Sequence, residues 1–208
     1  MPFKRYIGGE SEMMKKLFAE IPCIRGERLT LRALTAEDTD DLKELIGNDE
    51  VYRYLPTFLF EKKYDDPAVV TERLYDECLK DSLILGIFEG ECFCGLTEVY
   101  GYRAPFLKVS VGYRLLQSCW GRGVATEALG LLVDHLLNET PIRIITASTM
   151  LENKASAKVL KKNGFKHVAH AVYEDWGYPK LIKTDKWIRT ALAYRIEYRF
   201  RPAFEKAL

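Results

Sequence analysis

The sequence lacks the cysteine pattern of a disulfide-stapled or zinc-binding domain. Its 208 residues include five cysteines, an odd number, and no Cys-x-x-Cys pair. Cys92 and Cys94 lie in a strand-like run, so both side chains would share one face. We therefore expect reduced thiols inside a cell and no metal site.

The sequence also lacks an excess of charge and long apolar runs. It has 31 basic and 30 acidic residues and a net charge of +1, which argues against binding bulk nucleic acid. No apolar run approaches the length that spans a bilayer, and the N-terminus has no signal-peptide pattern. These absences predict a cytoplasmic protein with no membrane partner. The length suits one domain with a sizeable core.

A glycine-rich loop is present, but it lacks the endings of two common phosphate-binding loops. Residues 120–128 read Trp-Gly-Arg-Gly-Val-Ala-Thr-Glu-Ala, follow an expected strand at 108–116, and open a helix. The Gly-Lys-Ser/Thr ending of nucleotide triphosphatases is absent, and Thr126 replaces the third glycine of the dinucleotide fingerprint. Because the first N–H groups of a helix are unpaired, the loop still predicts a cradle for a phosphate or pyrophosphate.

A second segment, residues 153–165, forms an expected helix with two different faces. Asn153, Ser156 and Ala157 fall on one side at helical spacing, whereas lysines occupy most of the other. Gly164 is placed to end the helix. From the residues alone, Asn153 is an N-cap and Ser156 a small packing residue.

Together the two segments resemble the GCN5-related N-acetyltransferases (GNAT), most closely the branch of ribosomal-protein-alanine N-acetyltransferases. The family motifs match Trp120, Gly123, Ala125, Asn153, Ser156, Gly164 and Phe165. The looser likeness runs from Arg28 to about Arg189. It implies an α/β fold with a mixed, mostly antiparallel sheet of six to seven strands flanked by helices. It also implies that the strands on either side of the cradle helix splay apart to admit the pantetheine arm.

The resemblance implies acetyl-CoA as the cosubstrate. The residues expected to bind it are Val111, Gly112, Tyr113, Trp120, Gly121, Arg122, Gly123, Val124, Ala125, Thr126, Asn153, Ser156 and Lys158. The strand at 111–114 would supply a backbone N–H to the oxyanion. Arg122 and Lys158 are candidates for the ribose phosphate.

The resemblance also sets the catalytic candidates. Glu98 and Asp175 rank equally as the base, and Glu174 would point to the opposite face from Asp175. Many family members carry a tyrosine acid where this chain has Leu160, so Ser156 is the expected substitute. For each of these carboxylates, the simpler interpretation is an ordinary surface or turn residue with no catalytic role.

The histidines have weaker claims to a role. His135 falls on the outer face of the cradle helix. His167 and His170 are three residues apart in one expected strand, so they would lie on opposite faces and could not act as a pair.

The sequence predicts three regions: an N-terminal extension at 1–24, an acetyltransferase domain at 25–190, and a C-terminal extension at 191–208. A helix is expected at 11–21, packed on the domain or at a homodimer contact. The acceptor pocket is expected from segments 49–80 and 170–183, although the aromatic residues of 49–66 read more simply as core.

The expected acceptor is a primary amine, most simply a protein N-terminus. The alternatives are a small-molecule amine (amino acid, polyamine or aminoglycoside) and a non-catalytic acyl-CoA-binding domain.

Overall fold

The fold is built on one eight-stranded sheet. The computed structural model describes residues 17–18, 20–77 and 81–204, with side chains to 197. In spatial order the strands are β1 (Ile24–Arg25), β2 (Leu29–Arg32), β3 (Ser82–Glu89), β4 (Cys92–Arg103), β5 (Lys108–Leu115), β6 (Ile144–Met150), β8 (Ile182–Thr190) and β7 (Lys166–Glu174). β5 and β6 run parallel, and the other neighbours run antiparallel. The mixed sheet is confirmed, with one strand more than expected.

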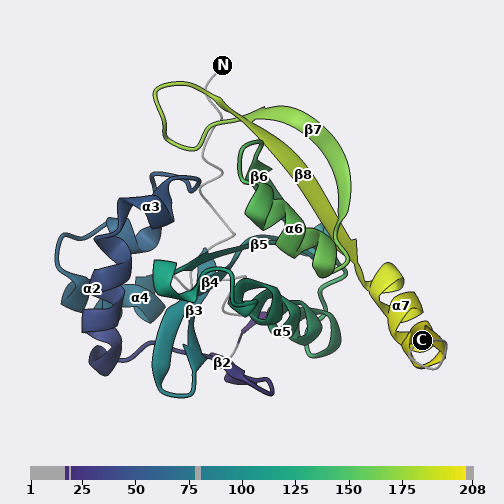
Figure 1. The fold of residues 1–208 in the computed structure, drawn as a ribbon, viewed down its shortest axis with the longest axis horizontal. Helices are drawn as coiled ribbons and strands as arrows, with labels where there is room; N and C mark the ends of the chain where they lie inside the picture. Colours follow the sequence, from purple (N-terminus) through teal and green to yellow (C-terminus); the bar gives the residue numbers. More distant parts are fainter. Residues whose placement is uncertain (1–16, 19, 78–80, 205–208) are drawn as a thin grey trace.

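The helices gather in separate groups around the sheet. Figure 1 shows α2 (Thr39–Ile46), α3 (Asp49–Tyr52) and α4 (Pro67–Glu77) together at one end. α5 (Val124–Asn138) and α6 (Lys154–Lys162) pack beside each other near the middle strands. α7 (Ala191–Phe204) leaves the end of β8 and projects from the body.

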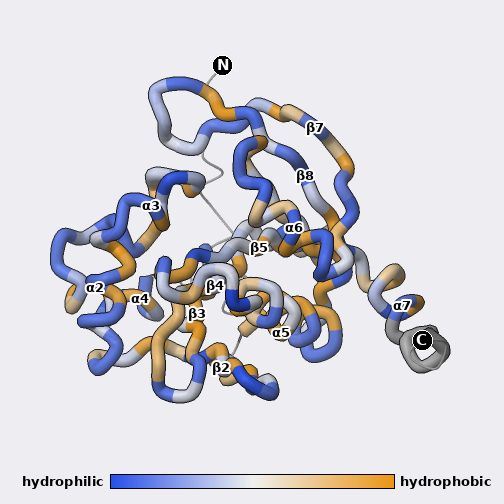
Figure 2. Tube along the Cα trace, viewed as in Figure 1, coloured by the Kyte–Doolittle hydropathy of each residue, from blue (hydrophilic) through white to orange (hydrophobic). Residues whose placement is uncertain are grey.

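The core packs α5 against the central strands and also includes buried residues of α2 and α4. Ala128, Leu129, Leu132, Val133 and Leu136 of α5 are buried, and their i, i+3 and i+4 spacing places them on one face of the helix. In Figure 2 the hydrophobic colours concentrate on β3, β4 and α5, whereas the connecting loops are mostly hydrophilic. Each such leucine or valine contributes about 1.5–3 kcal/mol by leaving water, so this stripe fixes α5 on the sheet.

β5 and β6 pair over only part of their length. The ladder joins Lys108 to Ile144 and ends where Ser110 meets Thr146. Beyond that point the described residues along the two facing edges have no ladder partner. The splay that the resemblance implied is therefore present.

The exposed edge of β5 has a defined backbone orientation. The Leu116 N–H donates to the Cys94 carbonyl of β4 at 2.9 Å, and the Leu115 carbonyl accepts from the Trp120 indole at 3.0 Å. Because backbone groups alternate sides along a strand, those of Val111 and Tyr113 point away from β4 and into the gap.

The β7–β8 hairpin contradicts the expectation for the two histidines. The register shifts twice, between His167 and Ala169 and between Ala169 and Val172, and Ala171 has a φ of +54°. An added residue in a strand reverses the facing of the residues after it. His167 and His170 therefore both contact Asp185 of β8, and the prediction that they cannot act as a pair was wrong.

A similar irregularity separates Cys92 from Cys94. The register of β3 and β4 shifts between Ile87 and Phe88, opposite this pair. Cys92 is exposed and Cys94 is buried, so the expected common face is not observed. The described cysteines, Cys23, Cys92, Cys94 and Cys119, are all free thiols.

The structure describes only part of the two predicted terminal extensions, 1–24 and 191–208. The helix expected at 11–21 lies largely outside the described residues, and the sheet itself begins at Ile24. The buried Tyr194 of α7 packs against the domain. Within the described ranges, no helix has the length and apolar character needed to cross a membrane.

Candidate active site

A large cleft passes through the gap between β5 and β6. Its volume is about 2240 Å³, and it reaches from the glycine loop and α6 to segment 54–60 and the β7–β8 turn. Val111 to Leu115 on β5 and Ala147 to Thr149 on β6 line it where the ladder has ended. The cleft can therefore hold one elongated ligand against β5 and a second molecule on the opposite side of the sheet.

The glycine loop forms the expected cradle. Gly121 and Gly123 have φ values of +72° and +82°, in the left-handed region that side chains disfavour. Gly123 is the N-cap residue of α5, so the first N–H groups of that helix have no intrahelical partner. Glu127 fixes the first turn by accepting hydrogen bonds from Arg28 and from the Leu29 N–H. The result is a rigid, electropositive helix end on the cleft wall.

The predicted cofactor residues line the cleft with one exception. Those that do are Val111, Gly112, Tyr113, Trp120, Gly121, Gly123, Val124, Ala125, Thr126, Asn153, Ser156 and Lys158. Arg122 is absent from the lining, and its guanidinium pairs with Glu89 on the β3–β4 hairpin. Of the two phosphate candidates, only Lys158 lies in the cleft.

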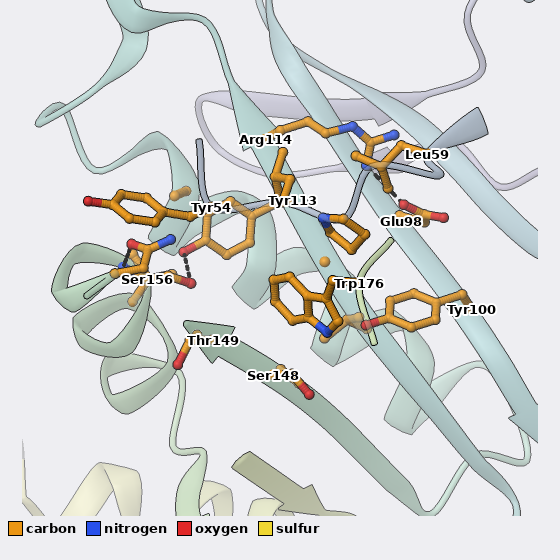
Figure 3. A pocket seen from close by; sticks show the side chains of 18 of the residues that line it. Tyr54, Leu59, Glu98, Tyr100, Tyr113, Arg114, Ser148, Thr149, Ser156 and Trp176 are labelled. Atoms are coloured by element: carbon orange, nitrogen blue, oxygen red, sulfur yellow. Dashed lines mark hydrogen bonds and ion pairs between the residues drawn. The ribbon is translucent and has the colours of Figure 1, made fainter. Parts of the chain in front are cut away.

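The start of α6 is joined to β5 by side chains. Asn153 caps the helix by accepting from the Ser156 N–H at 3.0 Å, as the sequence alone suggested. The Tyr113 hydroxyl donates to Ser156 Oγ at 3.0 Å, and burial raises the Tyr113 pKa to about 12 (Figure 3). Leu160 is buried in the core. The phenol of Tyr113 was not foreseen, although its position on the last strand before the cradle was the available signal.

A buried charge network forms one wall of the cleft. The Arg114 guanidinium lies between two carboxylates, 2.5 Å from Glu61 and 2.9 Å from Glu98. Burial raises the pKa of Glu98, and the neighbouring Arg114 only partly opposes that shift. Figure 3 shows the Glu98 carboxylate next to the Arg114 guanidinium. Glu98 is thus a desolvated carboxylate on the cleft wall, while its partners Arg114 and Glu61 were not foreseen.

The second candidate base lies at the rim. Asp175 is exposed in the β7–β8 turn, and its carboxylate accepts from the Gly177 N–H at 2.9 Å. Glu174 also lines the cleft and pairs with Lys186 and Thr184. β7 ends at Glu174, so Asp175 lies in the turn just beyond the strand, and both carboxylates line the cleft.

The two segments expected to form the acceptor pocket lie side by side. The Thr57 N–H donates to the Trp176 carbonyl at 2.9 Å, and the Tyr178 hydroxyl donates to the Leu55 carbonyl at 2.8 Å. Tyr54 and Trp176 face the cleft in Figure 3. The aromatic residues of this region are therefore divided between core and cleft wall.

Comparison with known proteins agrees with this geometry. The family model described as "Acetyltransferase (GNAT) domain" matches residues 28–166, two thirds of the chain. An uncharacterized N-acetyltransferase of Bacillus subtilis, YoaA, is 25% identical over 148 residues, which cover 69% of this chain and 82% of the relative. The chain belongs to the GNAT family of N-acetyltransferases.

Solved structures share the fold. A spermidine N-acetyltransferase from Vibrio cholerae, in complex with CoA and spermine, superposes with a TM-score of 0.67 at 19% identity, covering 81% of this chain and 99% of that one. RimL, a ribosomal L7/L12 α-N-protein acetyltransferase in complex with coenzyme A, gives 0.68 at 17% identity, covering 82% and 97%. The acceptors of these two proteins differ in class, although their folds are alike.

Proposed function

We propose that this protein transfers an acetyl group from acetyl-CoA to a primary amine, by direct attack of the amine on the thioester. The observation that carries the proposal is the cleft through the β5–β6 gap, with the α5 cradle at one end and carboxylates at the other. The pyrophosphate would bind at the α5 N-terminus, and the pantetheine arm would lie along the free edge of β5. Coenzyme A bound to the spermidine acetyltransferase and to RimL supports this choice.

Residues on β5 and α6 would stabilise the oxyanion and the leaving thiolate during acetyl transfer. The acetyl carbonyl would accept a hydrogen bond from the Val111 or Tyr113 N–H, which would stabilise the oxyanion as the amine attacks. When the carbon–sulfur bond breaks, the thiolate would accept a proton or a hydrogen bond from Ser156, whose hydroxyl is in turn supported by Tyr113. A thiolate leaves readily, so the weak acidity of a hydroxyl suffices.

The base that removes the amine proton is Glu98 in this proposal. Its burial raises its pKa toward the range in which a general base works best. Asp175 at the rim is the competing candidate, and its position suits an exposed, larger acceptor. Single variants Glu98→Gln and Asp175→Asn separate the two, because only loss of the base lowers kcat with a working acceptor. Glu139→Gln, an exposed carboxylate at the end of α5 outside the cleft lining, is the matched control.

The acceptor proposed first is a protein N-terminal amine. The carboxylates on the acceptor side are largely matched by cations of the chain itself, as in Glu98 with Arg114, Glu174 with Lys186 and Glu77 with Lys63. A polyamine carries several positive charges and would require unmatched carboxylates. A protein N-terminus carries one ammonium group and does not require several unmatched carboxylates.

The test is release of the coenzyme A thiol from acetyl-CoA with a panel of acceptors: peptides with free N-termini, spermidine, amino acids and aminoglycosides. The proposal predicts turnover with peptides and none with the same peptides blocked at the N-terminus. Turnover with spermidine alone would replace the acceptor class and keep the reaction. Binding of acetyl-CoA without turnover on the panel would favour an acyl-CoA-binding role.

A further inference from the structure

We propose that His167, His170 and Asp185 form a binding site for a divalent transition-metal ion of the zinc type. The three residues lie on the β7–β8 hairpin, and none of them lines the cleft. The site is independent of the proposed acetyl transfer.

The donor atoms are already close enough to share an ion. Asp185 Oδ1 lies 2.7 Å from His170 Nδ1 and 3.3 Å from His167 Nε2, and all three donors fall within 4.8 Å of one another. In a tetrahedral zinc site, bonds of about 2.0–2.1 Å place neighbouring ligand atoms about 3.4 Å apart. An ion therefore fits with small side-chain movements and no rebuilding of the hairpin.

The backbone of β7 is shaped so that both rings reach the same carboxylate. In a regular strand, two residues three apart face opposite sides. Here two register shifts and the left-handed Ala171 turn His170 back toward Asp185. A left-handed alanine costs about 1–2 kcal/mol, so this arrangement is held against a local preference.

The surroundings orient one ring and leave the ion accessible. The His167 ring packs on Trp187 with centroids 5.0 Å apart, and the Trp187 indole N–H donates to Thr149 at 3.0 Å. The His170 side chain is 69% exposed and that of Asp185 is 17% exposed. Open coordination positions would therefore be filled by water, and an ion can enter from solvent.

The donor set decides which class of ion fits. Two imidazoles and one carboxylate suit zinc, nickel, cobalt and copper, whereas magnesium and calcium require more oxygen ligands. β7 is the edge strand and pairs with β8 alone. A bound ion would add a second link between β7 and β8 beside the turn that carries Asp175 and Trp176 into the cleft.

The experiment is a zinc titration of the full-length, untagged protein in competition with a chromophoric chelator. We expect one saturable site per chain and no competition from magnesium or calcium. His167→Ala, His170→Ala and Asp185→Asn should each weaken zinc binding at least about tenfold. His135→Ala, which removes the half-buried histidine of α5, is the matched control and should bind zinc as the wild type does.

Two further readouts keep the test decisive. Zinc at about a hundred times the wild-type Kd should raise the wild-type melting temperature by roughly 5–10 °C and that of His170→Ala by about half as much or less, and a chelator should abolish both shifts. The absorption of the cobalt-loaded protein should lack thiolate charge-transfer bands. Three results would each overturn the proposal: thiolate bands in the cobalt spectrum, zinc affinity in the three ligand variants equal to that of the wild type, or no saturable zinc site.

Discussion

Replacing Arg114 with methionine should destabilise the protein strongly. The Arg114 side chain is 2% exposed and lies between Glu61, which is 1% exposed, and Glu98, which is 13% exposed. Methionine keeps much of the apolar stem but leaves two desolvated carboxylates without their cation. Breaking a buried pair in this way costs about 3–5 kcal/mol. At 2–4 °C per kcal/mol, the melting temperature should fall by roughly 6–20 °C.

The stability that Arg114→Met loses should also depend on pH, and it should be larger at neutral than at acidic pH. Without Arg114, the native pKa of Glu98 rises further above its unfolded value, because burial and the neighbouring Glu61 carboxylate remain while the opposing cation is gone. A carboxyl with a raised native pKa binds protons more readily when folded, so folding is favoured as the pH falls through that pKa. The variant should therefore be least stable relative to wild type near pH 7 and should regain stability toward pH 5.

The assay is urea unfolding at several pH values, with a constant m-value to validate comparison of midpoints. The double variant Arg114→Met with Glu61→Gln should recover part of the loss, because one uncompensated charge is gone. Arg53→Met is the control, since Arg53 is 60% exposed and pairs with Glu50 at 3.5 Å, and it should cost under about 1 kcal/mol. A loss in Arg114→Met no larger than in this control, or one that does not change with pH, would refute the reasoning.

Further substitutions test the cradle, the α6 contact and the base. Gly123→Ala should raise the KM for acetyl-CoA at least about tenfold and cost about 1 kcal/mol of stability, because alanine disfavours the positive φ of the loop. The control is Gly90→Ala, at a hairpin position with a similar positive φ and open space around it. It should cost a similar amount of stability and leave the KM unchanged. Tyr113→Phe removes the hydrogen bond to Ser156 and should cost about 1 kcal/mol in urea unfolding and lower kcat; an unchanged kcat would remove Tyr113 from the chemistry. Because burial raises the pKa of Glu98, kcat/KM should fall as the pH decreases through a value above 4.5, and Glu98→Gln should abolish this acidic limb together with most of the activity. A wild-type limb that persists in Glu98→Gln would assign it to another group.

Local chemistry made much of the fold and cradle predictable. Gly90 at the β3–β4 turn, Gly121 and Gly123 in the loop, and Gly164 after α6 all adopt positive φ, which few other residues tolerate. Such positions are readable from sequence because the constraint lies in the residue itself. The same holds for the apolar stripe of α5 and for Asn153 as an N-cap, because helical periodicity and capping act within a few residues.

The interior of the candidate site was less predictable, because its partners are distant in sequence. Glu61 and Glu98 meet at Arg114 only after the α3–α4 region has packed against the sheet. The phenol of Tyr113 reaches Ser156 only once α6 lies over β5. Neither contact has a sequence signature, since each depends on long-range packing.

The sequence by itself indicated the strand before the glycine loop and the cradle helix, and its two motifs indicated the class of cosubstrate through the family resemblance. Glycine conformation, helical spacing and two motifs in order depend on short-range physics. The tertiary structure decided where the β5–β6 ladder stops, which carboxylate is buried and which stays at the rim, and that His170 turns to the same side as His167. Those outcomes depend on strand register and bulges, which result from packing over the whole sheet.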